Sequence, residues 1–219
     1  MRILPSPKWW RDTKPTDLPA YGALQLQGKV DALDLDAVPV DPASGLRDLF
    51  FHRAHVTGLT IPLDWMHLTV TWSEFDNCTF TQKGGGILNE HGTSAQGSLA
   101  ARPSIYRNCV FQGVRFKGLG GFNMMASRFE NCDFLQCKFN GHNATETDLV
   151  NCRFIGKIDG CNWFGTVPEH EHDAGRRNDI ANNDFSQATL TDNIGWRGHF
   201  DIDSQIWPPG ARPSLLDQW

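Results

Sequence analysis

The residues best suited to metal chemistry lie in the run Glu-His-Glu-His-Asp at positions 169–173. Imidazole and carboxylate groups are suitable ligands for zinc and other divalent cations. The candidate ligands are therefore His170, His172 and Asp173. A polar run of alternating residues does not by itself hold such groups in a fixed arrangement, and we expect a solvated loop. A metal-dependent enzyme that uses this loop is one of the alternatives for function.

The six cysteines could bind a metal or form disulfides. Cys132 and Cys137 are separated by four residues, which is within the range of zinc-binding pairs. However, every cysteine lies two residues before an aromatic residue, and this common phase indicates a slot for a small buried side chain. We predict free, buried thiols and no metal site. The six are Cys78, Cys109, Cys132, Cys137, Cys152 and Cys161.

Two pairs of acidic residues have the spacing that places carboxylates on one side of a strand. They are Asp34 with Asp36 and Asp201 with Asp203, and we expect them to be solvent-facing charges. The chain contains no nucleophile–His–acid signature, P-loop or dinucleotide fingerprint. We therefore predict a protein with no catalytic residue and no cofactor.

The chain repeats with a period of five residues, and this repeat must position the candidate side chains. From Ser127 the sequence is SRFEN, CDFLQ, CKFNG, HNATE, TDLVN and CRFIG, with an apolar residue at the third place of each block. Helices repeat near 3.6 residues and strands near 2. A unit this short buries its apolar face only by stacking on its neighbours. The predicted core residues are Phe75, Cys78, Phe80, Cys109, Phe111, Phe129, Cys132, Phe134, Cys137, Phe139, Leu149, Cys152, Phe154, Cys161, Trp163, Phe185 and Leu190.

The same register defines the organisation of the chain. Residues 46–205 carry the repeat, with polar or small-residue insertions at 83–103 and 164–182 that we expect to be surface loops. The Pro- and Trp-rich segment 1–45 is expected to cap one end, and 206–219 to form a C-terminal tail.

Several positions fit the register less well. We place Trp65 at the centre of a repeat and His142 in a small inward slot. A bulge is expected at 119–126, with Met124 or Met125 filling space. One extra residue lies near 193–196, and a helical turn is expected over 44–51, with Ser44 as its N-cap.

The register resembles that of the pentapeptide-repeat family, whose motif is Ala-Asp/Asn-Leu-x-x with Cys and Phe as common variants. The resemblance implies an all-β fold, a right-handed quadrilateral β-helix in which each repeat forms one side of a square coil. Segment 175–210, which begins Gly-Arg-Arg and contains Asn-Asp-Phe-Ser, also resembles the last coil of small actinobacterial members without an assigned activity. Family members often pair through a C-terminal element, which implies a homodimer as one arrangement for this chain.

Some members of the family resemble a DNA duplex in shape and charge and protect DNA gyrase, which makes gyrase one candidate partner. That mechanism needs a continuous acidic stripe. Here residues 104–118 contain Arg107, Arg115 and Lys117 and no acidic residue, so the stripe is interrupted. We therefore favour a non-catalytic scaffold that binds another, unidentified protein, with the gyrase-protecting DNA mimic as the alternative.

Composition argues against several other classes of function. The net charge of −5 gives no basic patch, so we expect no direct binding to nucleic acid. The N-terminal residues lack the apolar core of a signal peptide, and no apolar stretch is long enough to span a membrane. The sequence predicts a cytoplasmic protein without a membrane partner.

Overall fold

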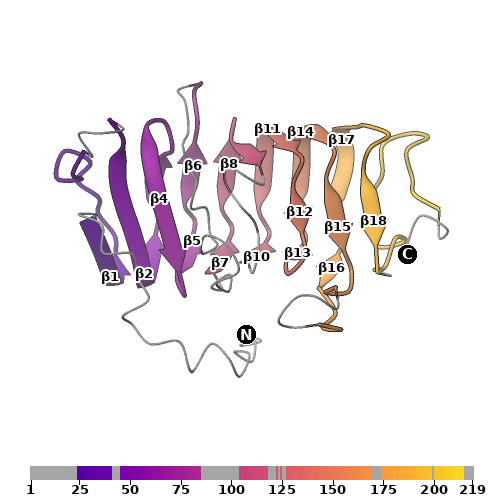
Figure 1. The fold of residues 1–219 in the computed structure, drawn as a ribbon, viewed down its shortest axis with the longest axis horizontal. Helices are drawn as coiled ribbons and strands as arrows, with labels where there is room; N and C mark the ends of the chain where they lie inside the picture. Colours follow the sequence, from indigo (N-terminus) through magenta and orange to yellow (C-terminus); the bar gives the residue numbers. More distant parts are fainter. Residues whose placement is uncertain are drawn as a thin grey trace.

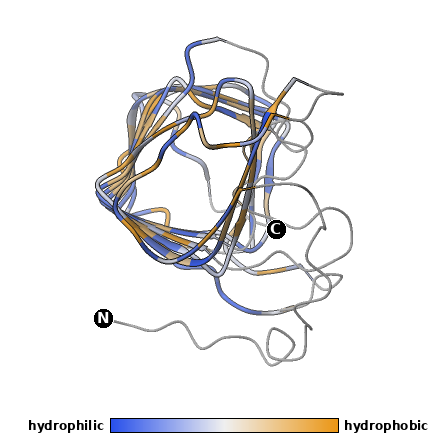
Figure 2. Cartoon of the chain, turned by 90° about the vertical axis from the view of Figure 1, so that its left-hand side faces the viewer, coloured by the Kyte–Doolittle hydropathy of each residue, from blue (hydrophilic) through white to orange (hydrophobic). Residues whose placement is uncertain are grey.

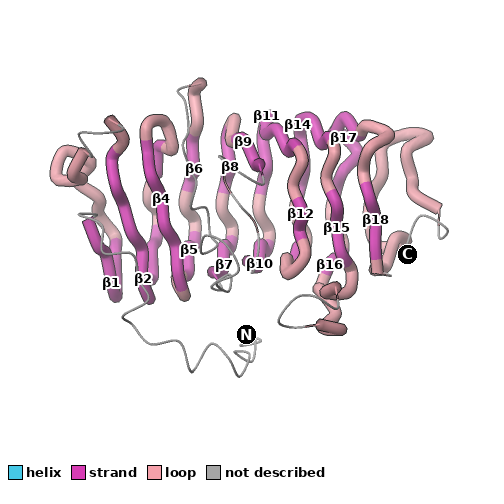
Figure 3. Tube along the Cα trace, viewed as in Figure 1, coloured by secondary structure: helices cyan, strands magenta, loops and turns pink. Residues whose placement is uncertain are grey.

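The computed structural model describes residues 24–40, 45–84, 104–117, 122, 124, 127–168, 174–198 and 200–214. These residues form a β-helix in which strands stack along one axis from β1 to β18 (Figure 1). Viewed along that axis, the coils superimpose as a four-sided outline (Figure 2). The described residues contain strands and loops and no helix (Figure 3). The predicted all-β fold class, a quadrilateral β-helix, is confirmed.

Three parallel sheets form the walls of the solenoid. The first, here called sheet A, has the order β1-β2-β5-β7-β10-β13-β16, and β4 also pairs with β2. Its strands are β1 (Leu24–Val30), β2 (Arg47–Thr57), β4 (Met66–Thr71), β5 (Glu74–Asp76), β7 (Ser104–Arg107), β10 (Ser127–Glu130), β13 (Asp148–Val150) and β16 (Ile180–Ala181).

Sheet B has the order β17-β14-β11-β8-β6-β3, with β9 also paired to β11, and sheet C has the order β12-β15-β18. Sheet B contains β3 (Thr60–Pro62), β6 (Thr79–Thr81), β8 (Val110–Gln112), β9 (Arg115–Lys117), β11 (Asp133–Asn140), β14 (Arg153–Asp159) and β17 (Asp184–Leu190). Sheet C contains β12 (Asn143–Ala144), β15 (Asn162–Phe164) and β18 (Gly195–Arg197).

The strand register follows the five-residue period. Phe129 pairs with Leu149 and Phe134 with Phe154, so partners in successive coils are four repeats apart. Central aromatic rings consequently stack in columns: the centroid of Phe134 lies 5.0 Å from that of Phe111 and 4.7 Å from that of Phe154. These distances match the spacing of adjacent strands, so ring stacking and backbone pairing reinforce each other.

Corners between the walls need a left-handed backbone, and this explains the polar residues that recur there. Asn108, Asn131 and Asn151 have φ of 53°, 53° and 54° at successive coils of one corner. Asparagine adopts this conformation more readily than other residues with a side chain. Asn131 Nδ2 donates to Asn108 Oδ1 at 3.3 Å, and Asn151 Nδ2 donates to Asn131 Oδ1 at 3.2 Å. The corner is therefore an amide ladder that runs parallel to the solenoid axis.

Sixteen of the predicted core residues are buried, and Leu190 is partly buried against the same core. Met124 is buried inside the irregular segment, as expected, while Met125 lies outside the described residues. Phe122, which the register did not assign, is also fully buried. The extra residue near 193–196 lies in the turn between Leu190 and Trp196.

Three expectations from the sequence are wrong. Trp65 is 59% exposed because it occupies a corner with φ of 57°, and Leu63 and Met66 fill the core beside it. The expected helical turn is replaced by β2, which begins at Arg47, and its proposed cap Ser44 lies outside the described residues.

Segment 164–182 is not wholly a surface loop, because Ile180 is buried in β16 at its end.

The described part of the N-terminal segment supplies a strand. β1 pairs in parallel with β2, with Leu26 opposite Phe51 and Val30 opposite Val56. The coil ladder therefore extends N-terminal to residue 46, and β1 is its first strand among the described residues. Residues 1–23 lie outside the described part of the chain.

Candidate functional site

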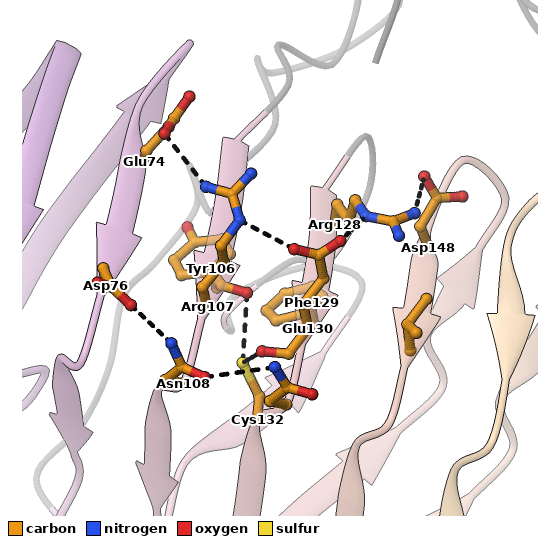
Figure 4. A network of polar contacts seen from close by, with 12 residues as sticks. Glu74, Asp76, Tyr106, Arg107, Asn108, Arg128, Phe129, Glu130, Cys132 and Asp148 are labelled. Carbon is orange, nitrogen blue, oxygen red and sulfur yellow. Dashed lines mark hydrogen bonds and ion pairs between the residues drawn. The ribbon is translucent and has the colours of Figure 1, made fainter. Parts of the chain in front are cut away.

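The outer surface of sheet A carries a continuous network of charged side chains (Figure 4), here called the charge ladder. Arg107 on β7 contacts Glu74 on β5 (Nη1–Oε2, 3.2 Å) and Glu130 on β10 (Nε–Oε2, 2.9 Å). Glu130 in turn accepts a 2.5 Å hydrogen bond from Arg128 Nε. Oppositely charged side chains that face each other across strands stabilise a sheet. The ladder consists of Glu74, Arg107, Arg128, Glu130, Asp148, Arg176 and Asp179.

The far end of the charge ladder is buried. Arg128 is 9% exposed and Asp148 is 2% exposed, and they lie directly opposite each other on β10 and β13. Arg128 Nη1 is 3.0 Å from Asp179 Oδ2 and 3.5 Å from Asp148 Oδ2. Asp148 Oδ1 also accepts hydrogen bonds from the Asp179 backbone N–H at 2.8 Å and from Arg176 Nη1 at 3.2 Å. The buried carboxylate is therefore satisfied by two guanidinium groups and one peptide group.

Pairing with arginine controls the electrostatics of this surface. Burial alone would raise the pKa of Glu130, but hydrogen bonds from Arg128 and Arg107 outweigh it and lower the pKa below its usual value. Glu130 is thus ionised at neutral pH and neutralised by its two arginine neighbours. This arrangement differs from an unpaired acidic stripe.

The charge ladder ends at a two-stranded arm formed by residues 165–168 and 174–178. Thr166 and Arg177 form an antiparallel bridge, and Val167 N–H donates to Arg176 O at 2.8 Å. Buried Asn178 fixes the base of the arm, because its Nδ2 donates to Thr145 O at 2.7 Å and to Phe164 O. The arm is therefore anchored to the solenoid, and Arg176 links it directly to Asp148.

The metal candidates His170, His172 and Asp173 lie outside the described residues. Among the residues that are described, no group of three or more His, Cys, Asp or Glu side chains could hold a metal ion. The other insertion begins at Lys83 and Gly84, whose backbone N–H groups donate to the Asp64 carboxylate at 2.8 and 3.1 Å. Its residues 85–103 are likewise outside the described part.

The two acidic pairs serve local turns. Asp34 Oδ1 accepts from Asp36 N–H at 3.0 Å, and Asp201 Oδ1 accepts from Asp203 N–H at 3.0 Å. A carboxylate that caps the backbone two residues on is a common turn device. In each pair the first carboxylate therefore bonds to the backbone of the second residue and is not aimed at a shared substrate position.

All six cysteines are free and buried. Four of them form a column in successive coils, in which each Sγ lies within 3.4–3.6 Å of a backbone oxygen of the preceding coil. Asn183 takes the same slot in the next coil and donates through Nδ2 to Leu149 O at 2.9 Å. The members of the column are Cys78, Cys109, Cys132 and Cys152.

We predict that native thiols resist modification. Burial raises the pKa of Cys137 to about 12, so almost none of it is the nucleophilic thiolate at pH 8. An aromatic disulfide reagent at pH 8 should label fewer than one thiol per chain in the native protein and all six in urea. Rapid labelling of two or more thiols before unfolding would contradict the inward register.

His142 occupies the inward slot predicted for it and is 1% exposed. Neither ring nitrogen has a hydrogen-bond partner among the described residues. Burial lowers the pKa of His142 to about 4, because the interior disfavours the charged imidazolium. The fold therefore holds the neutral ring.

This burial predicts a pH dependence of stability. In the unfolded chain His142 titrates near its ordinary value of 6.5. The contribution of the neutral His142 ring to the free energy of unfolding is fully present above pH 6.5. It is lost as the pH falls from 6.5 towards 4, and the loss is about 2 kcal/mol at pH 5. Urea unfolding at several pH values should show a shallower slope for His142→Leu than for the wild type. Identical slopes for the two proteins would exclude His142 as the source.

The sequence did not identify the charge ladder, although part of it was detectable. Arg128 and Asp148 are four repeats apart, as are Asp133 and Arg153, whose bidentate pair on sheet B has distances of 2.9 and 2.8 Å. A search for opposite charges at that separation finds both pairs. The contact between Arg128 and Asp179 spans an insertion, so no fixed spacing predicts it.

The fold and this surface define a parallel β-helical solenoid with ordered polar walls and an anchored arm. No family model matches the chain, and no curated protein matches it. Among solved structures, the chain is similar to a trypsin-treated variant of QnrB1, described as a plasmid-mediated fluoroquinolone resistance protein. The identity is 13% and the TM-score 0.32, over 70% of this chain and 78% of that one. A likeness this distant carries no functional argument.

Separately, the described residues include no helix long and apolar enough to cross a membrane.

Proposed function

We propose that this chain is a non-catalytic scaffold that binds another protein through the outer surface of sheet A and the arm beside it. The observation that supports the proposal most strongly is the charge ladder. Its side chains are held by several partners each, so the surface is ordered before a partner arrives. Preorganised polar groups reduce the entropic cost of association.

The physical character of the surface suits recognition by charge complementarity. Alternating arginine and carboxylate groups present both signs of charge, which favours a partner with a matching alternation and disfavours one of uniform sign. The free thiols also fit a reducing compartment, where disulfides are rare. We propose that the protein acts in the cytoplasm, which these thiols support.

The alternative function is protection of DNA gyrase by mimicry of DNA. The pairing of Glu74, Glu130 and Asp148 with arginines weakens this alternative on sheet A. We expect micromolar protein to leave supercoiling by purified gyrase unchanged. A concentration-dependent change in supercoiling would instead favour the mimic.

A comparative pull-down tests the scaffold proposal. The purified chain is used as bait in extract from its native host, with Arg107→Gln on sheet A and Arg153→Gln on sheet B as matched variants. Both remove one ion-paired guanidinium from an outer wall, half-buried for Arg107 and exposed for Arg153, and circular dichroism checks that both still fold.

We expect a partner that the wild type and Arg153→Gln retain and Arg107→Gln loses, and that binds the purified chain directly. A partner lost equally with both variants would contradict the assignment to sheet A. Absence of any direct binder, or turnover of a substrate by the chain, would contradict the scaffold proposal itself.

A further inference from the structure

A groove of about 620 Å³ lies at the C-terminal end of the solenoid. One wall is the turn 190–194 together with β18, and the other is the tail segment 210–213. In Figure 1, β18 is the last strand of the stack, and the segment that follows it turns around this end of the solenoid. The volume falls in the range of sites that bind small molecules or short peptide segments.

β18 offers an open strand edge to this groove. Among the described residues, β15 is the strand that pairs with β18 in sheet C: Gly195 N–H donates to Cys161 O at 2.9 Å, and Gly165 N–H donates to Arg197 O at 2.6 Å. Backbone groups of alternate residues in a strand point to opposite neighbours. The N–H and C=O of Trp196 therefore point away from β15, to the side where the next coil would add a strand.

The chain itself does not supply that strand within the described residues. After β18 the chain pairs with the beginning of β17 instead. Ile206 N–H donates to Asn183 O, and Phe185 N–H donates to Ile206 O. The remaining open edge is the part that borders the groove. An exposed edge of this kind is a template for pairing with another chain.

Two guanidinium groups line the groove from opposite walls. Arg197 Nε donates to Asn162 Oδ1 at 3.3 Å, and Arg212 is ion-paired with Asp203. The lining contains these two arginines and one acidic residue, Asp192, while Asp203, the partner of Arg212, lies outside the lining. Arginine has five N–H donors in a planar arrangement that matches a carboxylate.

Gly195 is required for this arrangement. A Cβ atom at this position would lie 2.2 Å from Asn162 Oδ1 and 3.2 Å from Arg197 Nε. Glycine therefore lets the Asn162 side chain lean over β18 and hold the guanidinium of Arg197 beside the open edge.

We propose that this groove binds an extended acidic peptide segment of a partner protein, which pairs with β18 as an added strand and places carboxylates at Arg197 and Arg212. The inference rests on the proposed function, because it assumes a protein partner. Strand addition supplies affinity through the main chain, and the two arginines supply selectivity for acidic side chains. A free small anion would use the arginines but not the strand edge.

Binding of a defined probe tests the proposal. The probe is the peptide acetyl-Thr-Glu-Val-Glu-Thr-amide, titrated into the full chain and followed by two-dimensional NMR of the backbone amides. We expect saturable shifts centred on Trp196. Binding should weaken at least fivefold for Arg197→Gln and for Arg212→Gln, and should be unchanged for Arg153→Gln, which lies on sheet B.

Two altered probes separate the contributions. A probe with Gln in place of Glu removes the carboxylates, and one with N-methylated Val and Thr blocks strand pairing; both should bind at least fivefold more weakly. Free glutarate that competes as well as the peptide would overturn strand addition and indicate a small-anion site. Probe binding that is absent, or equal in the wild type and both groove variants, would overturn the proposal.

The outcome is distinguishable from failure of the proposed function. If the partner from the pull-down binds Arg197→Gln as tightly as it binds the wild type, the groove assignment fails and the sheet A scaffold stands. If the acidic probe binds as expected but no variant of sheet A affects a partner, the groove assignment stands and the sheet A assignment fails.

Discussion

Replacing Phe134 by Ala is expected to lower the free energy of unfolding by about 3–5 kcal/mol, the range for a buried large-to-small change. Phe134 is fully buried, and its ring stacks between those of Phe111 and Phe154 in the neighbouring coils. The space left by the ring could be filled only by shifting the stacked strands of the solenoid, so we expect a cavity to remain. Urea or thermal unfolding of both proteins measures the difference.

The control for this change lies on the same strand. Lys138 is also on β11, but its side chain points outward and is exposed. We expect Lys138→Ala to change stability by no more than about 0.5 kcal/mol. Equal effects of the two substitutions would mean that the inward positions of β11 are wrongly assigned.

The contrast between these positions explains why the core could be predicted from sequence. Burial is set by the place of a residue within its five-residue block, and Phe134 shares its place with Phe129, Phe139 and Phe154. Because the position repeats, the assignment of each of these residues to the core supports the assignment of the others. Where a block is irregular this support is lost, and the residue type alone predicts burial poorly.

Trp65 and Phe122 illustrate this loss. Trp65 was placed inside because it stands at the centre of a five-residue block, yet the local backbone turns left-handed at this residue and the side chain leaves the core. Phe122 lies in a segment whose length is not a multiple of five, but it forms a parallel bridge with Phe116 and is buried. In both cases the path of the chain between coils decides the outcome, and the period does not specify that path.

The functional surfaces were less predictable than the core. Outward positions within the strands, unlike the corners, have no repeated constraint on residue type, so an arginine in β7 and a glutamate in β10 resemble ordinary solvated charges. Their partnership depends on which strands become neighbours after insertions of different length, as between Arg107 and Glu74. The groove depends on where the tail returns beside β18, which no local pattern encodes.

Asp148 provides the strongest test of the charge ladder. Asp148→Ala is expected to lower the free energy of unfolding by about 3 kcal/mol, because removal of one member of a buried ion pair leaves its partner uncompensated. The Asp179 backbone N–H would lose its acceptor, and Arg176 would lose its anchor. Arg128 would keep Glu130 and Asp179, which holds the cost near the lower end of the range for such pairs.

Two matched variants separate charge from packing in this prediction. Asp148→Asn retains an acceptor for the Asp179 N–H and should be less destabilising than Asp148→Ala. Asp133→Ala removes an exposed carboxylate that is also paired with arginine, and its cost should not exceed about 1 kcal/mol.

Loss of Asp148 should also loosen the arm, because the Arg176 guanidinium of the arm is bonded to this carboxylate of the solenoid. Limited trypsin digestion should therefore cut after Arg176 or Arg177 faster in Asp148→Ala than in Asp133→Ala. If both variants were cut at the same rate and were equally stable, the buried end of the charge ladder would not be what orders the arm. The surface proposed to bind a partner would then have to be sought on the solenoid walls alone.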